Sequence, residues 1–296
     1  MTELHSAVVD SVGDLEAGAS DAVVPWWSFT KTLIAVALLR LAERGAVALD
    51  DPLDGFPFTP RQLLQHRAGV GEYGGVAAYR DAVARGEAAW PPEELLARVP
   101  PDDLLFAPGQ GWAYSNVGYL LLRQLLEARS GAALPQALRE LVLSPLGLGR
   151  AKVAETVDDM NGCAFAGDHG YDPGWVYHGT VVGPVSEAAL ALHRIMTGNV
   201  LAPASRAAML DRYAIGGPLP GRPWQTTGYG LGLMMGEGLC AGMAAAKPVA
   251  GHSAVGPGSV GAVCHTAELR RTAAVFSDDA DEGPAEFCAV ERLFLA

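Results

Sequence analysis

The chain has 296 residues, half of them hydrophobic and 18% charged, which is enough to bury a large core as one domain or two closely packed ones. Its net charge of −12 would repel nucleic acid, so we expect no nucleic-acid partner. No N-terminal targeting pattern is visible and the longest apolar run, at positions 33–39, is too short to span a bilayer, so we expect a cytoplasmic protein without membrane contact.

Helix and strand signals divide the chain into three stretches. Short strands are expected near the N-terminus, at positions 6–9 and 22–26. Helical patterns follow, several of them opened by a cap or a proline; they begin at Ser28, Thr59, Pro91 and Asn116 and also cover 134–143 and 185–197. Strand patterns return at 228–235, 260–265 and 272–276, before a closing helix at 286–295.

Strands at both ends of the chain, with helices between them, predict a sheet assembled from distant segments. We therefore expect an α/β (α+β) fold in which positions 1–27 and 198–296 form a sheet domain and positions 28–197 a mainly helical domain, with the active site between them. The four cysteines have no CxxC spacing and the seven histidines no HxxxH or HxH pair, so we expect neither a metal site nor a cofactor.

A serine and a lysine lie three positions apart where the first helical pattern begins, at Ser28 and Lys31. Residues with this spacing share one face of a helix. A serine hydroxyl is a poor nucleophile until a base takes its proton, and a desolvated lysine can be that base. The alternative interpretation is an exposed helix with one solvated lysine.

A second group of polar residues, Tyr114-Ser115-Asn116, lies on a loop before a long helical pattern. A tyrosine beside a lysine can lose its phenolic proton more readily than its usual pKa of about 10 suggests, and could then move protons for a serine. The Asn116 amide could donate a hydrogen bond to a substrate carbonyl. The alternative is a surface aromatic followed by an asparagine that caps the helix.

A third group lies in the stretch Gly251-His252-Ser253-Ala254-Val255. It approaches the G-x-S-x-G elbow of α/β-hydrolases, but Val255 holds the last glycine position, and too few residues follow for the acid and histidine that must come after the serine. The other interpretation places His252 and Ser253 on an edge strand that lines the site, with backbone N–H groups facing a substrate oxyanion.

Taken together, the motifs Ser28-Phe29-Thr30-Lys31, Tyr114-Ser115-Asn116 and His252-Ser253-Ala254 follow the order S-x-x-K, Y-x-N and K-T-G or H-[ST]-G. This order resembles the serine β-lactamase and penicillin-binding-protein superfamily, in particular the branch of class C β-lactamases, DD-peptidases and family VIII esterases. Flanking stretches at 44–52, 59–66 and 145–148 resemble the same branch. The resemblance implies a mostly antiparallel sheet flanked by helices, with a largely helical second domain.

The resemblance also implies a role for each residue. Ser28 would attack a carbonyl, Lys31 would take its proton, and Tyr114 would pass a proton to the leaving group. Asn116 would position the substrate and the lysine. The backbone N–H groups of Ser28 and Val255 would form the oxyanion hole, and no cofactor is implied.

Two departures from the family pattern bear on specificity. His252 replaces the lysine that class C β-lactamases place near the substrate carboxylate, and a histidine is only partly charged at neutral pH. Ala254 replaces a glycine and would narrow the strand face along which a substrate lies.

We therefore expect a serine hydrolase that acts through an acyl-enzyme on small esters or peptide-like amides. The alternatives are a D-aminoacyl peptidase or DD-carboxypeptidase, a weak β-lactamase, an acyltransferase, and a non-catalytic ligand-binding relative. Its partner would be a small-molecule ester or amide, and the sequence gives no oligomeric state.

Overall fold

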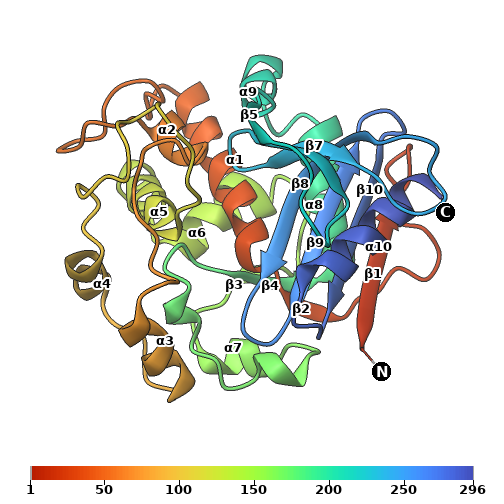
Figure 1. Cartoon of the computed structure of the whole chain (residues 1–296), viewed down its shortest axis with the longest axis horizontal. Coiled ribbons are helices and arrows are strands. Elements are labelled where there is room, and N and C mark those ends of the chain that lie inside the picture. The colour runs from red at the N-terminus through yellow and green to blue at the C-terminus, as the bar shows by residue number, and fades with distance from the viewer. Residues whose placement is uncertain (1, 296) are drawn as a thin grey trace.

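The computed structural model describes residues 2–295 and is built around a seven-stranded antiparallel sheet with the strand order β1-β10-β9-β8-β7-β6-β5 (Figure 1). Its strands are β1 (Leu4–Val9), β5 (Tyr213–Gly216), β6 (Trp224–Tyr229), β7 (Met234–Gly238), β8 (Lys247–Val255), β9 (Val260–Thr266) and β10 (Arg271–Ser277). The N-terminal strand β1 pairs with β10, so the predicted sheet of distant segments is confirmed.

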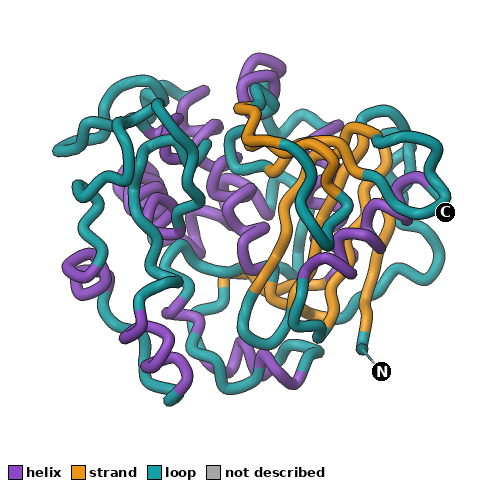
Figure 2. The backbone as a smooth tube through the Cα atoms, viewed as in Figure 1, coloured by secondary structure: helices purple, strands orange, loops and turns teal. Residues whose placement is uncertain are grey.

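The segment between β1 and β5 is mainly helical, and much of it between residues 44 and 116 is loop (Figure 2). Its α-helices are α1 (Thr30–Glu43), α2 (Pro60–Leu64), α3 (Ala77–Ala84), α4 (Pro92–Arg98), α5 (Asn116–Ser130), α6 (Leu134–Leu138), α7 (Val157–Asn161), α8 (Val185–Thr197) and α9 (Pro203–Met209); α10 (Glu282–Phe294) follows the last strand. A small antiparallel sheet joins β2 (Val23–Pro25), β4 (Val181–Pro184) and β3 (Lys152–Val153).

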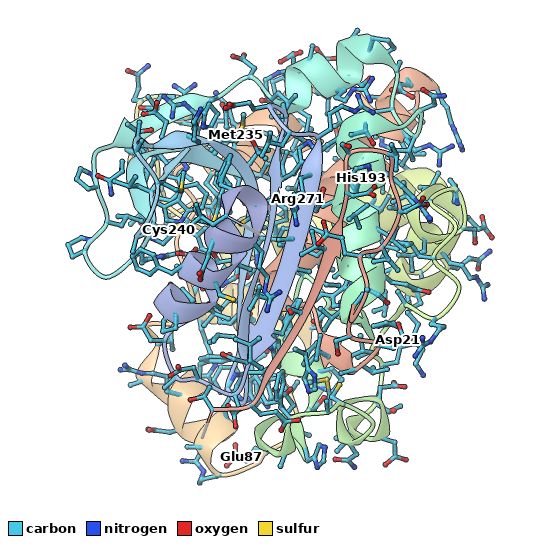
Figure 3. All side chains as sticks on the ribbon, turned by 90° about the vertical axis from the view of Figure 1, so that its right-hand side faces the viewer. Asp21, Glu87, His193, Met235, Cys240 and Arg271 are labelled. Atoms are coloured by element: carbon cyan, nitrogen blue, oxygen red, sulfur yellow. The ribbon has the colours of Figure 1, made fainter. Side chains whose placement is uncertain are left out.

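Both faces of the large sheet are covered by helices. Successive side chains of a strand point to opposite faces, and apolar residues occur on both. Val8 of β1 packs in the cluster that contains Ala285 and Leu293 of α10, whereas its neighbours Ala7 and Val9 pack in the main core. Helix α8 covers that second face and contacts β1, β9 and β10. In Figure 3, which views the side of the two termini, His193 marks α8; its Nδ1 lies 3.2 Å from the Thr272 hydroxyl of β10.

Helix α1 is the central helix of the molecule. Every residue from Thr30 to Leu39 is buried, which is typical of a helix surrounded by protein on all sides. The Thr32 hydroxyl donates to the carbonyl of Gly232 at 2.6 Å, and the Thr30 hydroxyl accepts from the Val181 N–H at 2.9 Å. These bonds fix the start of α1, and with it Ser28, between the large sheet and the helices.

The sequence predicts most elements near their observed places, with some differences. The single strand expected at 228–235 is two strands, β6 and β7, because the chain turns between them: Gly232 has a φ of +75°, and a Cβ there would lie 2.5 Å from the Ala35 side chain. The predicted helix at 134–143 is α6 continued by one π-helical turn. Helices α3, α7 and α9 and strands β3, β4 and β5 are absent from the prediction.

The division into two domains stays a prediction. Helix α8, which the predicted boundary assigns to the helical part, packs on the large sheet. No helix within residues 2–295 is long and apolar enough to cross a membrane.

Candidate active site

Ser28 lies in a short 3₁₀ turn, Trp27–Phe29, that leads directly into α1. The preceding residue, Trp27, has a φ of +39°, a left-handed conformation that is strained for a side chain of this size. Its indole N–H donates to the Ser259 hydroxyl at 3.0 Å, and Ser259 donates to the buried Asp168 carboxylate at 2.9 Å. This anchored, strained turn presents the Ser28 side chain at the surface of a cavity.

The structure brings Ser28, Lys31 and Tyr114 into direct contact. Lys31 Nζ and Tyr114 Oη each lie 3.0 Å from Ser28 Oγ, although Tyr114 is 86 positions away in the sequence. Lys31 is fully buried, so the alternative of a solvated lysine on an exposed helix is wrong. Burial lowers the pKa of Lys31 well below its usual value, while the Glu72 carboxylate acts in the opposite direction.

A third group contacts the lysine and was not identified from the sequence. His178 Nε2 lies 3.0 Å from Lys31 Nζ, and the ring also hydrogen-bonds the backbone of Trp27. Burial lowers the pKa of His178 well below its usual value, so the imidazole is neutral and accepts a hydrogen bond from the lysine. The 147 positions between the two residues explain why no local motif predicts the contact.

The lowered pKa expected for the Tyr114 phenol is wrong. Burial raises the pKa of its phenol, and the hydrogen bond to Ser28 only partly opposes this effect. The tyrosine is therefore a protonated donor to Ser28 Oγ in the free protein. Its ring packs on the His66 ring, with 4.4 Å between the centroids, and His66 Nδ1 accepts from the Ser115 N–H at 3.1 Å.

Asn116 is held by Glu72, an acidic residue that belongs to none of the sequence motifs. The Asn116 backbone N–H donates to one Glu72 oxygen at 2.5 Å, and the side-chain amide donates to the other at 3.1 Å. The helix cap is Ser115 instead, whose hydroxyl accepts from the Gly118 N–H at 2.8 Å. That Asn116 positions the substrate stays a prediction.

Strand β8 passes beside Ser28 and has one free edge there. It pairs with β7 only as far as Gly251 and with β9 as far as Val255, so residues 252–255 form a local edge, as the sequence predicts for His252 and Ser253. Ser253 lies within this strand and not on a strand-to-helix elbow; its hydroxyl contacts Glu286 and the Arg222 guanidinium. That the Val255 N–H forms part of an oxyanion hole stays a prediction.

Two expectations about this strand require correction. Burial lowers the pKa of His252 to about 3, so it is neutral and carries no partial charge; its Nε2 lies 2.7 Å from Tyr229 Oη. Ala254 is fully buried in the main core, and its methyl group does not narrow the substrate face. His252, Ser253 and Val255 line the cavity, whereas Ala254 does not line it and packs in the main core.

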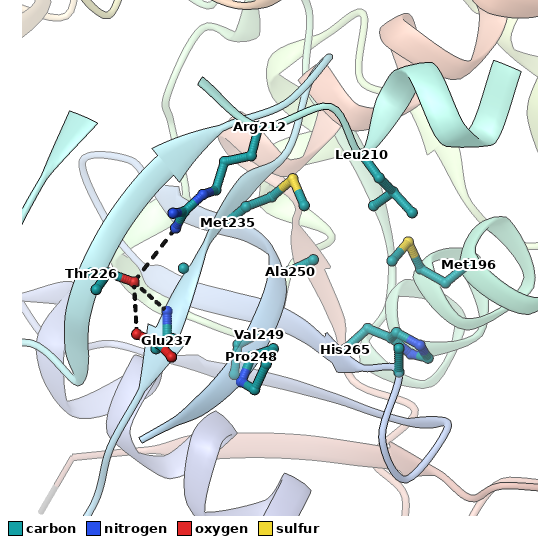
Figure 4. Close-up of a pocket in the computed structure, with 12 residues that line it drawn as sticks. Met196, Leu210, Arg212, Thr226, Met235, Glu237, Pro248, Val249, Ala250 and His265 are labelled. Atoms are coloured by element: carbon teal, nitrogen blue, oxygen red, sulfur yellow. Dashed lines mark hydrogen bonds between the residues drawn. The ribbon is translucent and has the colours of Figure 1, made fainter. Parts of the chain in front are cut away.

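The cavity beside Ser28 and Tyr114 has a volume of about 480 Å³, within the range of small-molecule sites. A separate cavity of about 490 Å³ lies between β7, β8 and the end of α8 and shares no residue with it (Figure 4). In this second cavity the Thr226 hydroxyl contacts Glu237 and Arg212. Ser28, Lys31 and Tyr114 do not line the second cavity. Within the described residues, no group of three or more His, Cys, Asp or Glu could hold a metal ion.

The sequence profile of the beta-lactamase family matches residues 6–294. The chain belongs to this family.

Among its relatives, esterase EstB of Burkholderia gladioli is 32% identical over 160 residues, which cover 46% of this chain and 41% of that protein. Penicillin-binding protein 4* of Bacillus subtilis is 28% identical over 141 residues, covering 43% of this chain and 29% of that protein. These alignments thus span less than half of the length of these curated family members.

Two solved structures have the same fold. A D-stereospecific amidohydrolase from Streptomyces sp. superposes with a TM-score of 0.76 at 23% identity and covers 96% of this chain and 93% of its own. The D-amino acid amidase from Ochrobactrum anthropi SV3 superposes with a TM-score of 0.78 at 20% identity and covers 98% and 94%. At this identity the likeness shows the fold, a β-lactamase/transpeptidase-like antiparallel sheet with helices, and not the substrate.

Proposed function

We propose that the protein is a serine hydrolase that acts through an acyl-enzyme on small esters or peptide-like amides. The observation that carries the proposal is the placement of a buried lysine and a protonated tyrosine at 3.0 Å from the same serine oxygen. A neutral lysine can accept the serine proton, and a protonated tyrosine can donate one.

The proposed steps balance their protons. Lys31 takes the proton of Ser28 as Oγ attacks the carbonyl carbon, and the N–H groups of Ser28 and Val255 stabilise the oxyanion. The bond to the leaving group breaks as Tyr114 donates its proton to the departing oxygen or nitrogen. The Lys31 ammonium returns the proton to Tyr114, and water, activated by the same groups, then hydrolyses the Ser28 ester.

The charges at the far wall of the cavity favour an uncharged substrate. Arg222 lines this cavity and binds Glu286 through two nitrogens and Glu282 through the third, at 2.8 Å. The three groups together carry one net negative charge. A substrate carboxylate, as in penicillins or D-alanyl peptides, would meet a cation that is already paired with carboxylates. A neutral ester or amide needs no cation, so this pairing does not weaken its binding.

Substrate panels separate this proposal from its alternatives. We expect short p-nitrophenyl esters to be turned over with a higher kcat/KM than nitrocefin or benzylpenicillin. D-Aminoacyl amides test the second candidate, a D-aminoacyl peptidase or DD-carboxypeptidase. Acyl transfer to an added alcohol faster than to water would indicate an acyltransferase. Nitrocefin turnover equal to that of the esters would contradict the charge argument.

A further inference from the structure

Ser28 lies where two cavities meet. The larger, of about 480 Å³, is lined by Tyr114 and by residues of β6, β7 and β8. The smaller, of about 160 Å³, also reaches Ser28 and is lined in large part by aromatic rings. Among residues 2–295, Ser28, Asn116 and Val255 are the ones that line both cavities. An ester bound at Ser28 therefore has one space for each of its two halves.

If the proposed function holds, the position of Tyr114 assigns each half of the ester to one of the two cavities. The group that protonates the leaving atom must lie within hydrogen-bond reach of it. Tyr114 lines the larger cavity and not the smaller one. The leaving group therefore lies in the larger cavity, and the acyl chain, which remains bonded to Ser28, lies on the opposite side.

Aromatic rings that pack on one another form much of the wall of the smaller cavity. The Tyr73 hydroxyl donates to the Trp175 carbonyl at 3.1 Å, and the Tyr73 ring lies 4.9 Å from that of Tyr79. Tyr79 packs edge-on against Trp175 at 5.4 Å, and Trp27 packs edge-on against Tyr171 at 5.7 Å. Trp27 and Trp175 are almost completely buried, so these two rings cannot swing outward without opening the core, whereas Tyr79 and Tyr171 are half-buried.

We propose that this aromatic pocket binds the acyl group of the substrate and restricts it to a short chain. A group the size of a water molecule, such as one carbon of an acyl chain, occupies about 30 Å³. The volume of about 160 Å³ therefore holds an acyl chain of roughly five carbons. The substrates are accordingly esters or amides of short-chain acids with larger alcohol or amine parts. We expect penicillins, whose acyl half carries a bulky side chain, to be poor substrates.

A chain-length series tests the pocket. With p-nitrophenyl esters from acetyl to decanoyl, we expect kcat/KM to rise roughly fourfold for each added methylene that is buried, to reach a maximum near four or five carbons, and to fall beyond it. Tyr79→Ala removes one wall and should move the maximum to longer chains. Gly74→Val should move it toward acetyl; the added Cβ meets only a Glu72 oxygen, at 3.6 Å, so the backbone tolerates it.

Two controls keep the test specific. Tyr79→Phe retains the ring and should retain the wild-type maximum. Ile215→Trp narrows the larger cavity, which Ile215 lines, and should change the preference among leaving groups but not among acyl chains. Thermal unfolding checks that each variant is folded.

The outcomes also separate this inference from the proposed function. If no ester is turned over and no Ser28 adduct forms, the proposed function is wrong. If Ser28-dependent turnover is present but Tyr79→Ala changes the leaving-group preference and leaves the chain-length maximum in place, the hydrolase stands and the acyl-pocket assignment is wrong.

Discussion

Replacing His178 should change the basicity of Lys31 without touching the nucleophile. The imidazole accepts a hydrogen bond from Lys31 Nζ at 3.0 Å in a fully buried position. A hydrogen bond to a charged group contributes about 1.5–3 kcal/mol, and this acceptor favours the ammonium form over the neutral amine. His178→Leu removes the acceptor at similar volume, so the charged form of Lys31 loses stabilisation.

The sign and size of the effect follow from this loss. One pKa unit corresponds to about 1.4 kcal/mol, so the pKa of Lys31 should fall by about one to two units. Because the base is active when neutral, the acid limb of kcat/KM should move to lower pH by the same amount. A weaker base should also reduce the plateau rate. His178→Gln, which retains an acceptor oxygen, should restore most of the wild-type position of the acid limb and most of the plateau rate.

The assay is the pH dependence of kcat/KM for a short p-nitrophenyl ester with the wild type and both variants, together with thermal unfolding. A purely structural role for His178 would lower the unfolding temperature and leave the acid limb unchanged. An unshifted limb in folded His178→Leu enzyme would refute the reasoning.

Three further predictions concern charged groups. Lys31→Arg should be nearly inactive toward esters, because a guanidinium does not deprotonate; an active variant would contradict lysine as the base. Burial raises the pKa of Asp168 to about 6, which favours the folded state below pH 4 and costs up to about 3 kcal/mol above pH 6. Asp168→Asn should therefore raise the unfolding temperature more at pH 8 than at pH 4, and an equal change at both would contradict the shift. Glu286→Ala should lower the free energy of unfolding in urea by about 3–5 kcal/mol, because it leaves Arg222 partly buried without its main partner; a loss below 1 kcal/mol would contradict this.

The sequence predicts what depends on local spacing. Ser28 and Lys31 are one helical turn apart, and the apolar face of α1 follows them directly, so both the motif and its helix could be found. The antiparallel sheet made from the two ends of the chain could be expected from the strand patterns together with the family resemblance.

The rest depends on contacts between distant segments. His178 reaches Lys31, and Glu72 holds Asn116, only after the loops fold against α1 and α5. The same folding buries Tyr114 and raises its pKa, which is why the lowered pKa expected from the motif is wrong. The direction in which Ala254 points depends on the register of β8, which one short motif cannot fix.

The central claim is that Ser28 forms the acyl-enzyme, and covalent labelling tests it most directly. The protein is treated with a fluorophosphonate, its intact mass is measured, and the modified peptide is mapped. We predict one adduct on Ser28, absent in Ser28→Ala and retained in the matched control Ser253→Ala. An adduct on Ser253, or labelling that persists in Ser28→Ala, would contradict the account.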